Sequence, residues 1–61
     1  MKKNDLEREL RKLGWWFKRH GGNHDYWTNG QVHESVPRHN EIKEMLAKKI
    51  LKTAKNNPPK K

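Results

Sequence analysis

All four histidines of this chain lie within residues 18–39, in the segment KRHGGNHDYWTNGQVHESVPRH. An imidazole has an ordinary pKa of about 6.5, so it can donate or accept a proton near neutral pH, and its neutral form is a common metal ligand. A cluster of histidines in a short segment therefore suggests three kinds of site: a metal centre, a catalytic site for proton transfer, or a surface that contacts a polyanion.

A metal centre is the least supported of the three interpretations. His20 and His24 are separated by a Gly-Gly-Asn turn, so they cannot bind one ion from adjacent turns of a helix. No known zinc-ligand spacing is present, and the chain has no cysteine. We therefore expect neither a metal nor any other cofactor.

RNA cleavage is a reaction that histidines can catalyse without a cofactor. RNA carries its own nucleophile, the 2′-hydroxyl beside each phosphate, so cleavage needs a base for that proton, an acid for the leaving 5′-oxygen and positive charge near the phosphate. His24 is the best-placed histidine because it follows the turn at Gly21 and Gly22, where missing side chains let a phosphate backbone approach. Lys18 and Arg19 precede this turn as phosphate contacts. The plainer alternative is that His24 is a surface histidine after a turn, with no chemical role.

The charge of the chain favours a polyanionic partner. Its 61 residues include 15 Lys and Arg against 7 Asp and Glu, which gives a formal net charge of +8. So large a basic excess in a short chain is typical of nucleic-acid binding, although a solubilising surface or an acidic protein partner would explain the same charge. A chain this short forms one small domain without a deep substrate cleft, so any chemistry should occur on an open face.

The sequence contains no candidate membrane span. The leucines near its N-terminus, Leu6, Leu10 and Leu13, are separated by charged residues. The absence of cysteine also fits a reducing compartment. We therefore expect a cytoplasmic protein that does not contact a membrane.

The sequence predicts a first helix over residues 5–13. Asn4 is expected to be its N-cap, Glu7 completes the pattern of a capping box, and Gly14 is well placed to end the helix. The residues of its apolar face recur at helical spacing and are Leu6, Leu10 and Leu13.

A second helix is predicted over residues 41–54, with Asn40 as its N-cap. Its expected apolar stripe consists of Ile42, Met45, Leu46 and Ile50. The remaining residues, 55–61, are polar and broken by prolines, which predicts a disordered basic tail. Residues 1–54 would then form the single domain.

Three strands are predicted between the helices, over residues 15–20, 24–28 and 31–36. These segments are rich in aromatic and β-branched residues. The Gly-Gly-Asn turn separates the first two strands, and Asn29-Gly30 is the typical dipeptide of a two-residue hairpin turn between the last two. Pro37 should end the third strand.

The resulting α-β-β-β-α order predicts an α+β domain in which a three-stranded antiparallel sheet carries both helices on one face. With a two-residue turn, Tyr26 pairs with His33 and His24 with Ser35, and strand alternation places all four on the open face. The same register places Asp25 on the helix-facing side. The apolar residues expected to face the helices are Trp27, Val32 and Val36.

Three segments resemble the HicA family of toxin mRNA interferases from bacterial toxin–antitoxin pairs. They are HGGNHDYW at 20–27, VPRH at 36–39 and EIKEMLAKKILKTA at 41–54. The resemblance implies a fold like that of a double-stranded-RNA-binding domain, and cleavage of mRNA without a metal, which arrests translation. It also implies a cognate HicB-type antitoxin that holds the toxin inactive.

The resemblance assigns the sharpest role to His24. In the family, a histidine just after the glycine turn, at the start of the second strand, is needed for RNA cleavage, and His24 matches that histidine. Gly22 matches the turn glycine. Pro37, Arg38 and His39 match the element that leads into the second helix.

We therefore predict a metal-independent endoribonuclease toxin with His24 as its catalytic base. The predicted RNA-binding residues are Lys18, Arg19, Gly22, Tyr26, Arg38 and His39. The general acid is left open among His33, His39, Tyr26 and water. The alternatives are a non-catalytic RNA-binding module of the same fold and a protein that acts only through an acidic partner. The expected partners are mRNA and the antitoxin, and the free toxin is expected to be monomeric.

Overall fold

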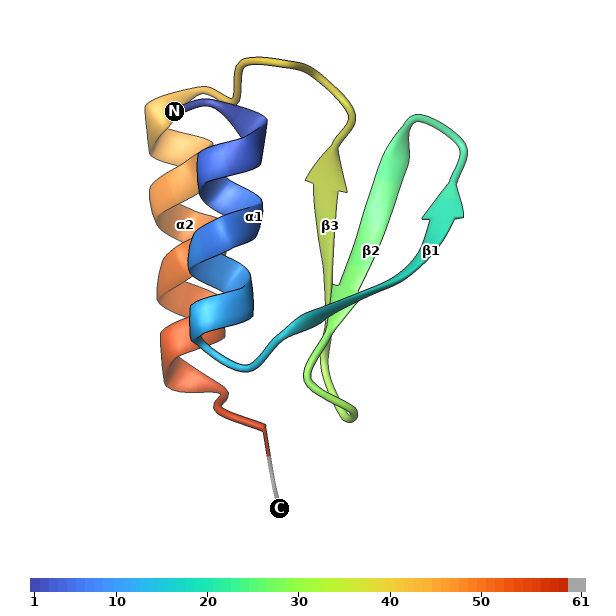
Figure 1. Ribbon diagram of the computed structural model, residues 1–61, viewed down its shortest axis with the longest axis vertical. Coiled ribbons are helices and arrows are strands. Elements are labelled where there is room, and N and C mark those ends of the chain that lie inside the picture. Colours follow the sequence, from blue (N-terminus) through green and yellow to red (C-terminus); the bar gives the residue numbers. More distant parts are fainter. Residues whose placement is uncertain (60–61) are drawn as a thin grey trace.

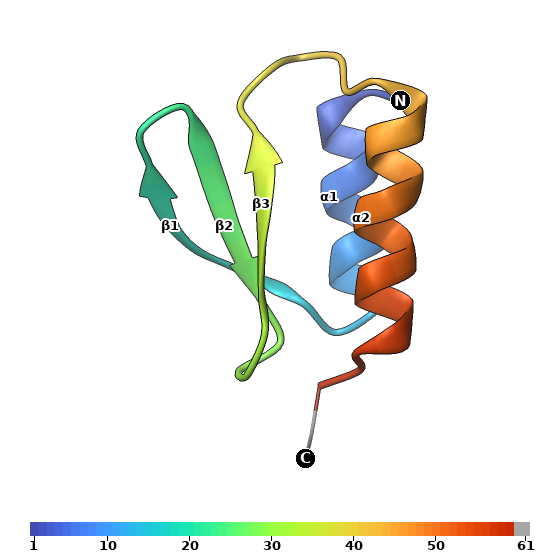
Figure 2. The same ribbon diagram turned by 180° about the vertical axis from the view of Figure 1, so that it is seen from behind.

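The computed structural model describes residues 1–59 and contains two helices and three strands. In chain order these are α1 (Lys3–Lys12), β1 (Trp16–Gly21), β2 (His24–Thr28), β3 (His33–Pro37) and α2 (Glu44–Asn56). The strands form one antiparallel sheet in the order β1-β2-β3, and the two helices lie side by side on one side of it (Figures 1 and 2). The predicted α+β class and α-β-β-β-α order are confirmed, and the arrangement is compatible with a double-stranded-RNA-binding-domain-like fold.

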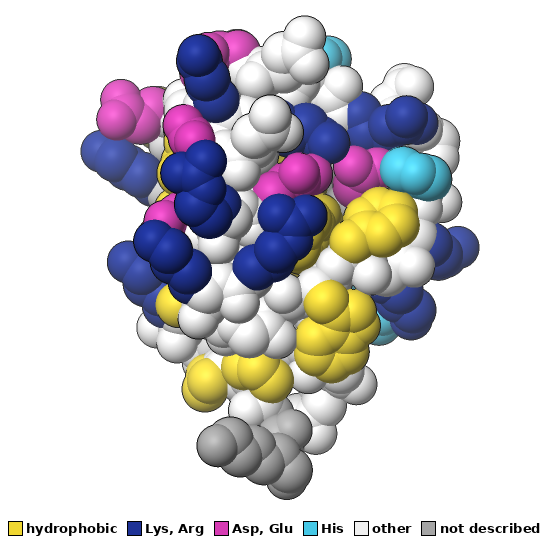
Figure 3. Space-filling view, viewed as in Figure 1, with side chains coloured by type: hydrophobic (Ala, Val, Ile, Leu, Met, Phe, Trp, Pro, Cys, Tyr) yellow, Lys and Arg dark blue, Asp and Glu magenta, His cyan; other side chains and the backbone are white. Residues whose placement is uncertain are grey.

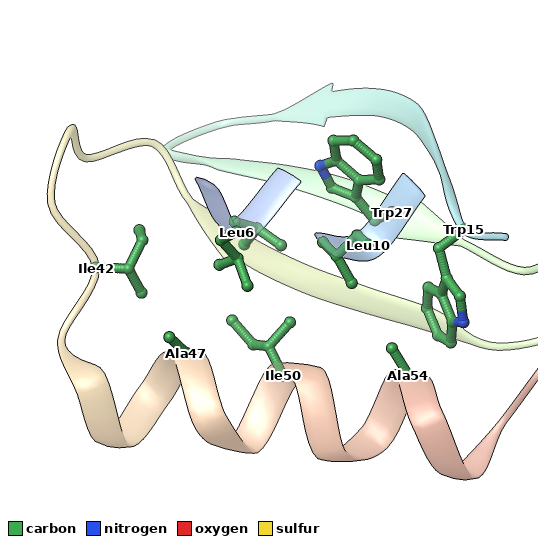
Figure 4. Close-up of a cluster of buried hydrophobic side chains, with 9 residues drawn as sticks. Leu6, Leu10, Trp15, Trp27, Ile42, Ala47, Ile50 and Ala54 are labelled. Atoms are coloured by element: carbon green, nitrogen blue, oxygen red, sulfur yellow. The ribbon is translucent and has the colours of Figure 1, made fainter. Parts of the chain in front are cut away.

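The helices and the sheet enclose one hydrophobic core (Figure 4). α1 contributes Leu6 and Leu10, and both side chains are fully buried, as predicted. α2 contributes Ala47, Ile50 and Ala54, and the two small alanines leave room for the bulky side chains that face them. The core is completed by Trp15, Trp27, Val36 and Ile42.

The predicted apolar stripe of the second helix is wrong at Met45, whose side chain is 86% exposed. The predicted stripe counts helical spacing from Ile42, which places Met45 on the buried face. Ile42, however, lies before α2, in the segment that leads into the helix, so this spacing does not apply. Within α2 itself, the residues that face the core are Ala47, Ile50 and Ala54, and Leu46 is partly buried beside them.

The end of α1 is set by Gly14, as predicted. Gly14 has a φ of 88°, a conformation that costs a residue without Cβ little. Its N–H donates to the carbonyl of Arg11 at 3.0 Å, and the N–H of Trp15 donates to the carbonyl of Leu10 at 3.0 Å. This pair of bonds is the Schellman arrangement, which satisfies the last carbonyls of the helix and turns the chain toward the sheet.

Both predicted helix caps are wrong. α1 begins at Lys3, two residues earlier than expected, with Lys2 as its N-cap, so Asn4 lies inside the helix. α2 begins at Glu44 with Lys43 as its N-cap, and Asn40 lies outside the helix. Neither N-cap makes a side-chain hydrogen bond.

Contacts between the two ends of the sequence explain both changes. The N–H of Lys3 donates to the carbonyl of Asn40 at 3.0 Å, and the N–H of Ile42 donates to the carbonyl of Met1 at 2.7 Å. The segment around Asn40 is therefore paired with the N-terminal segment in an extended conformation and cannot continue as helix. Local sequence patterns do not report this pairing, because its partners are 37 or more positions apart.

The connection between β2 and β3 is longer than the predicted two-residue turn. Thr28 pairs with His33, so residues 29–32 form the loop. Inside it, the side-chain oxygen of Asn29 accepts hydrogen bonds from the N–H groups of Gln31 at 2.8 Å and Val32 at 2.7 Å. The side-chain oxygen of Asn29 thus takes the place of a backbone carbonyl as the acceptor for these two N–H groups.

The register of the hairpin is shifted by two residues from the prediction. Tyr26 pairs with Ser35 rather than with His33, and Asp25 lies opposite Val36. Because side chains alternate along a strand, a shift of two residues leaves every side chain on its predicted face. The predicted open face is therefore confirmed even though the predicted pairs are wrong, and its members include His24, Tyr26, His33 and Ser35.

The C-terminal segment is more ordered than predicted over its first residues. α2 continues to Asn56, so residues 55–56 are helical rather than part of a basic tail. The carbonyl of Asn57 accepts hydrogen bonds from Trp15 Nε1 at 3.1 Å and from Asn29 Nδ2 at 2.7 Å. These bonds connect the end of α2 with the start of β1 and with the hairpin loop. Residues 60–61 of the predicted tail lie outside the described residues.

Replacing Asn29 by alanine should lower the free energy of unfolding by about 2 kcal/mol, because a buried side chain that makes three hydrogen bonds is lost. Urea denaturation followed by tryptophan fluorescence measures this loss. The matched control is Gln31→Ala, which changes an exposed residue of the same loop and should have an effect within about 0.5 kcal/mol. Equal losses for the two variants would show that the Asn29 bonds do not hold the hairpin.

Candidate functional site

The open face of the sheet carries several of the predicted RNA-binding residues. The pairing of β1 with β2 changes register between Phe17 and Arg19, so Lys18 is an extra residue in a bulge. Lys18 Nζ lies 2.8 Å from His33 Nε2, and the Arg19 guanidinium lies 5.1 Å from the centre of the Tyr26 ring. The bulge therefore directs two consecutive basic side chains over the same face of the sheet.

The position of Tyr26 depends on Gly21. The tyrosine ring lies against β1 at this glycine, and a Cβ added to Gly21 would overlap ring atoms of Tyr26. Gly21 pairs with His24, so the ring is held next to the candidate catalytic histidine. The sequence predicts a turn and room for a phosphate backbone at Gly21, but it does not predict this close approach of the Tyr26 ring.

His24 is exposed at the first position of β2, between Gly21 on β1 and Pro37 on β3. The N–H of Arg38 donates to the carbonyl of Asn23 at 3.1 Å, which continues the contact between the two chain segments beyond the last strand pair. The glycine turn, His24 and the segment from Pro37 onward therefore lie at one end of the sheet. The structure brings together these three elements, which the sequence could only pair by resemblance.

A groove of about 590 Å³ opens beside His24. It lies where the end of β3 passes into α2, and its residues are His24, Pro37, His39, Glu41, Ile42, Lys43 and Leu46. His39 also lines a second hollow of about 330 Å³ together with Asn23 and Arg38. His24 and His39 thus share one groove, whereas His33 lies at the opposite end of β2, paired with Thr28.

Asp25 is the centre of an ionic network on the helix-facing side of the sheet. It is only 3% exposed, and its carboxylate lies 2.7 Å from His20 Nδ1, 3.2 Å from Lys3 Nζ and 3.6 Å from Arg38 Nε. Lys3 also contacts Glu7 at 2.9 Å. Arg38, predicted to bind RNA, therefore lies beside a buried carboxylate, and the structure does not place it with Lys18 and Arg19.

The network keeps Asp25 ionised. Burial raises the pKa of this carboxyl, but hydrogen bonds from His20 and Lys3 outweigh burial and leave the pKa below its ordinary value of 3.8. The same contacts, led by the hydrogen bond to Glu7, raise the pKa of Lys3. Strand alternation predicts that Asp25 faces the helices, but it does not predict the basic partners of this carboxylate. A buried strand carboxylate requires cationic neighbours, and this requirement is the signal that would have found them.

The edge strand β1 exposes an aromatic side chain on each face. Trp16 is 48% exposed and Phe17 is 40% exposed. The Phe17 ring lies 4.9 Å from the His20 ring and 6.3 Å from the Trp27 ring, measured between centroids. Figure 3 shows the helices and the sheet from the side, as in Figure 1: Lys and Arg side chains gather over the helices, and hydrophobic and histidine side chains are exposed on the side of the sheet.

Within residues 1–59, no group of three His, Asp or Glu side chains is arranged to hold a metal ion. No helix in the same range is long and apolar enough to cross a membrane.

The chain matches a known protein family over most of its length. Residues 4–55 match the family model described as "HicA toxin of bacterial toxin-antitoxin". This range includes all three strands and nearly all of both helices, together with His24 and the segment from Pro37 to His39. No curated protein and no solved structure gives a significant match.

Replacing Asp25 by asparagine should lower the free energy of unfolding by roughly 3 kcal/mol at neutral pH, because three basic groups lose a buried partner. Since the folded pKa of Asp25 lies below 3.8, its stabilising effect is present above that pH and is lost as the pH falls through the folded value. The difference between wild type and Asp25→Asn in urea denaturation should therefore narrow below pH 3.8.

The matched control is Glu34→Gln on β3, which makes the same change of carboxylate to amide. Burial raises the pKa of Glu34, so folding does not favour its ionised form. Glu34→Gln should therefore change the free energy of unfolding little. A difference between Asp25→Asn and wild type that is small at neutral pH, or that widens in acid, would contradict the stabilising role of the Asp25 network.

Proposed function

Because the chain belongs to the HicA toxin family of bacterial toxin–antitoxin systems, we propose that it is an endoribonuclease that cleaves mRNA without a metal and so arrests translation, with His24 as its catalytic histidine. The observation that carries the proposal is the position of His24. It is exposed at the end of an open, basic sheet face, between a glycine turn and the segment from Pro37 to His39.

In the proposed reaction, His24 takes the proton from the 2′-hydroxyl that attacks the adjacent phosphate. An imidazole suits this step because its ordinary pKa lies near neutral pH, and one positioned base contributes about 10²–10⁴-fold to the rate. The leaving 5′-oxygen must receive a proton from an acid. Of the candidates, His39 is favoured because it lines the same groove as His24, whereas His33 is engaged by Lys18 at the far end of the sheet.

The open face supplies the proposed contacts to RNA. Lys18 and Arg19 reach over this face and carry the positive charge that attracts the phosphate backbone. Tyr26 offers a ring on which a base can stack, beside His24. The net charge of +8 adds a general attraction for RNA of any sequence.

Membership of the family implies a second partner, the antitoxin of the toxin–antitoxin pair. We propose that this partner is a HicB-type protein that neutralises the toxin. The proposed substrate, mRNA, places the activity in the cytoplasm, and the free toxin is proposed to act as a monomer.

His24→Ala should reduce RNA cleavage by about 10²–10⁴-fold, because the general base is removed. RNA affinity should change little, since the basic residues of the open face remain. Gel analysis of a long mRNA incubated in EDTA measures cleavage, and a gel-shift titration measures affinity. The matched control is His33→Ala, which removes an exposed histidine at the start of β3, on the same face but at the other end of the sheet.

Three outcomes of this experiment would be informative. Loss of cleavage for His24→Ala with activity retained in His33→Ala supports the proposal. If neither wild type nor variants cleave but all of them shift the RNA, the protein is a non-catalytic RNA-binding module of the same fold. If RNA is neither cut nor bound in a salt-sensitive way, the chain acts only through a protein partner.

The double variant Lys18→Ala/Arg19→Ala should weaken RNA binding and reduce the slope of log affinity against log salt by about 1.4, because each lost phosphate contact to a single strand removes about 0.7. The control is Arg8→Ala/Lys12→Ala, which removes the same charge from α1, where both residues pair with acidic neighbours. An equal change of slope in the two double variants would mean that net charge, and not the open face, determines RNA binding.

A further inference from the structure

The groove beside His24 differs in character from the basic open face. Its apolar lining comes from Pro37, Ile42 and Leu46, and its volume of about 590 Å³ is in the range of small-ligand sites. Its polar lining includes Glu41 and Lys43 in addition to the histidines. The groove therefore combines an apolar surface for a flat group with a carboxylate acceptor, an ammonium donor and two imidazoles.

These properties fit a nucleobase. A base has two apolar faces that pack against hydrophobic side chains and an edge that carries donors and acceptors. An RNA with its phosphate at His24 has a base attached to the neighbouring ribose, and the groove is continuous with His24. A phosphate would find Lys43 there but would also meet the Glu41 carboxylate, so the groove suits a neutral group better than an anion.

Glu41 gives the groove a preference among bases. A hydrogen bond from the Met1 ammonium group to Glu41 Oε2, at 2.8 Å, lowers the pKa of this carboxyl. The carboxylate is therefore ionised at neutral pH and can only accept hydrogen bonds. Carboxylates accept hydrogen bonds from exocyclic amino groups such as that of cytosine, and they repel the carbonyl that uracil presents at the same position.

We infer that this groove binds the nucleobase next to the scissile phosphate and that Glu41 selects bases with an exocyclic amino group over uracil. The inference rests on the proposed function of His24 for the position of the RNA. It assigns Glu41, with Leu46 as part of the apolar surface, as a specificity-determining residue of the site.

The first experiment maps every cleavage end on a long RNA and compares the bases at the flanking positions. The wild type should show a preference of about 10-fold against uracil at one flanking position, as expected when one hydrogen bond to a base edge is lost. Glu41→Gln should bring that preference close to unity, because an amide can also donate to a carbonyl. Leu46→Asp should reduce cleavage, and the control Met45→Asp, which adds the same charge at a side chain that is 86% exposed, should not.

Two results of the mapping would overturn the inference. One is cleavage by the wild type with no bias at any flanking position. The other is a bias that Glu41→Gln leaves unchanged. Because Glu41 is exposed on the surface, Glu41→Gln should fold even if Leu46→Asp does not, so a failure of Leu46→Asp to fold leaves the test intact.

A second experiment separates the inference from the proposed cleavage activity. The protein is titrated with cytidine 5′-monophosphate and with uridine 5′-monophosphate, and the backbone amide shifts are followed by NMR. We expect shifts at Ile42, Lys43 and Leu46 with at least a several-fold lower Kd for the cytidine nucleotide. If the wild type does not cleave RNA but this result holds, the proposed function fails and the base subsite stands. Shifts confined to the open face around Lys18 and Arg19, or no shift of the groove residues with either nucleotide, would overturn the subsite.

Discussion

The arrangement of this small protein depends on one buried carboxylate. Asp25 is 3% exposed in β2, and a charge in that position is tolerated because basic groups from three separate segments surround it. Lys3 comes from α1, His20 from β1 and Arg38 from the segment that follows β3. The carboxylate therefore joins the first helix, the edge strand and the entry to α2 at the end of the sheet where His24 lies.

Because side chains alternate along a strand, the buried position of Asp25 also determines which side chains lie on each face of the sheet. Asp25 and His24 are neighbours in β2, so fixing the aspartate toward the helices directs the histidine toward the open face. The helix-facing side holds the core and the ionic network. The open face keeps Lys18, Arg19 and Tyr26 accessible, and these side chains are positioned by a bulge and a close approach to glycine and not by burial.

Local patterns predicted the order of elements, the helix end at Gly14 and the location of His24 after its turn. They failed where the deciding contact comes from a distant segment. Asn40 has the composition of a helix cap, but its carbonyl is taken by the N-terminal segment. Asn29 belongs to a typical tight-turn dipeptide, but its side chain builds a longer loop. The partnership of Arg38 with Asp25 and the groove beside His24 could not be predicted, because each is assembled from segments that meet only in the folded chain.

The central claim is that His24 promotes attack by the 2′-hydroxyl of RNA. The most direct measurement uses one RNA with a mapped cleavage position and the same RNA with a single 2′-deoxy nucleotide there, both incubated with wild-type protein in EDTA. We expect the unmodified RNA to give a 2′,3′-cyclic phosphate and a 5′-hydroxyl end, and the deoxy substitution to block cleavage at that position. Cleavage of the deoxy substrate at the same position, or products with 5′-phosphate and 3′-hydroxyl ends, would show that water is the nucleophile and would contradict the claim.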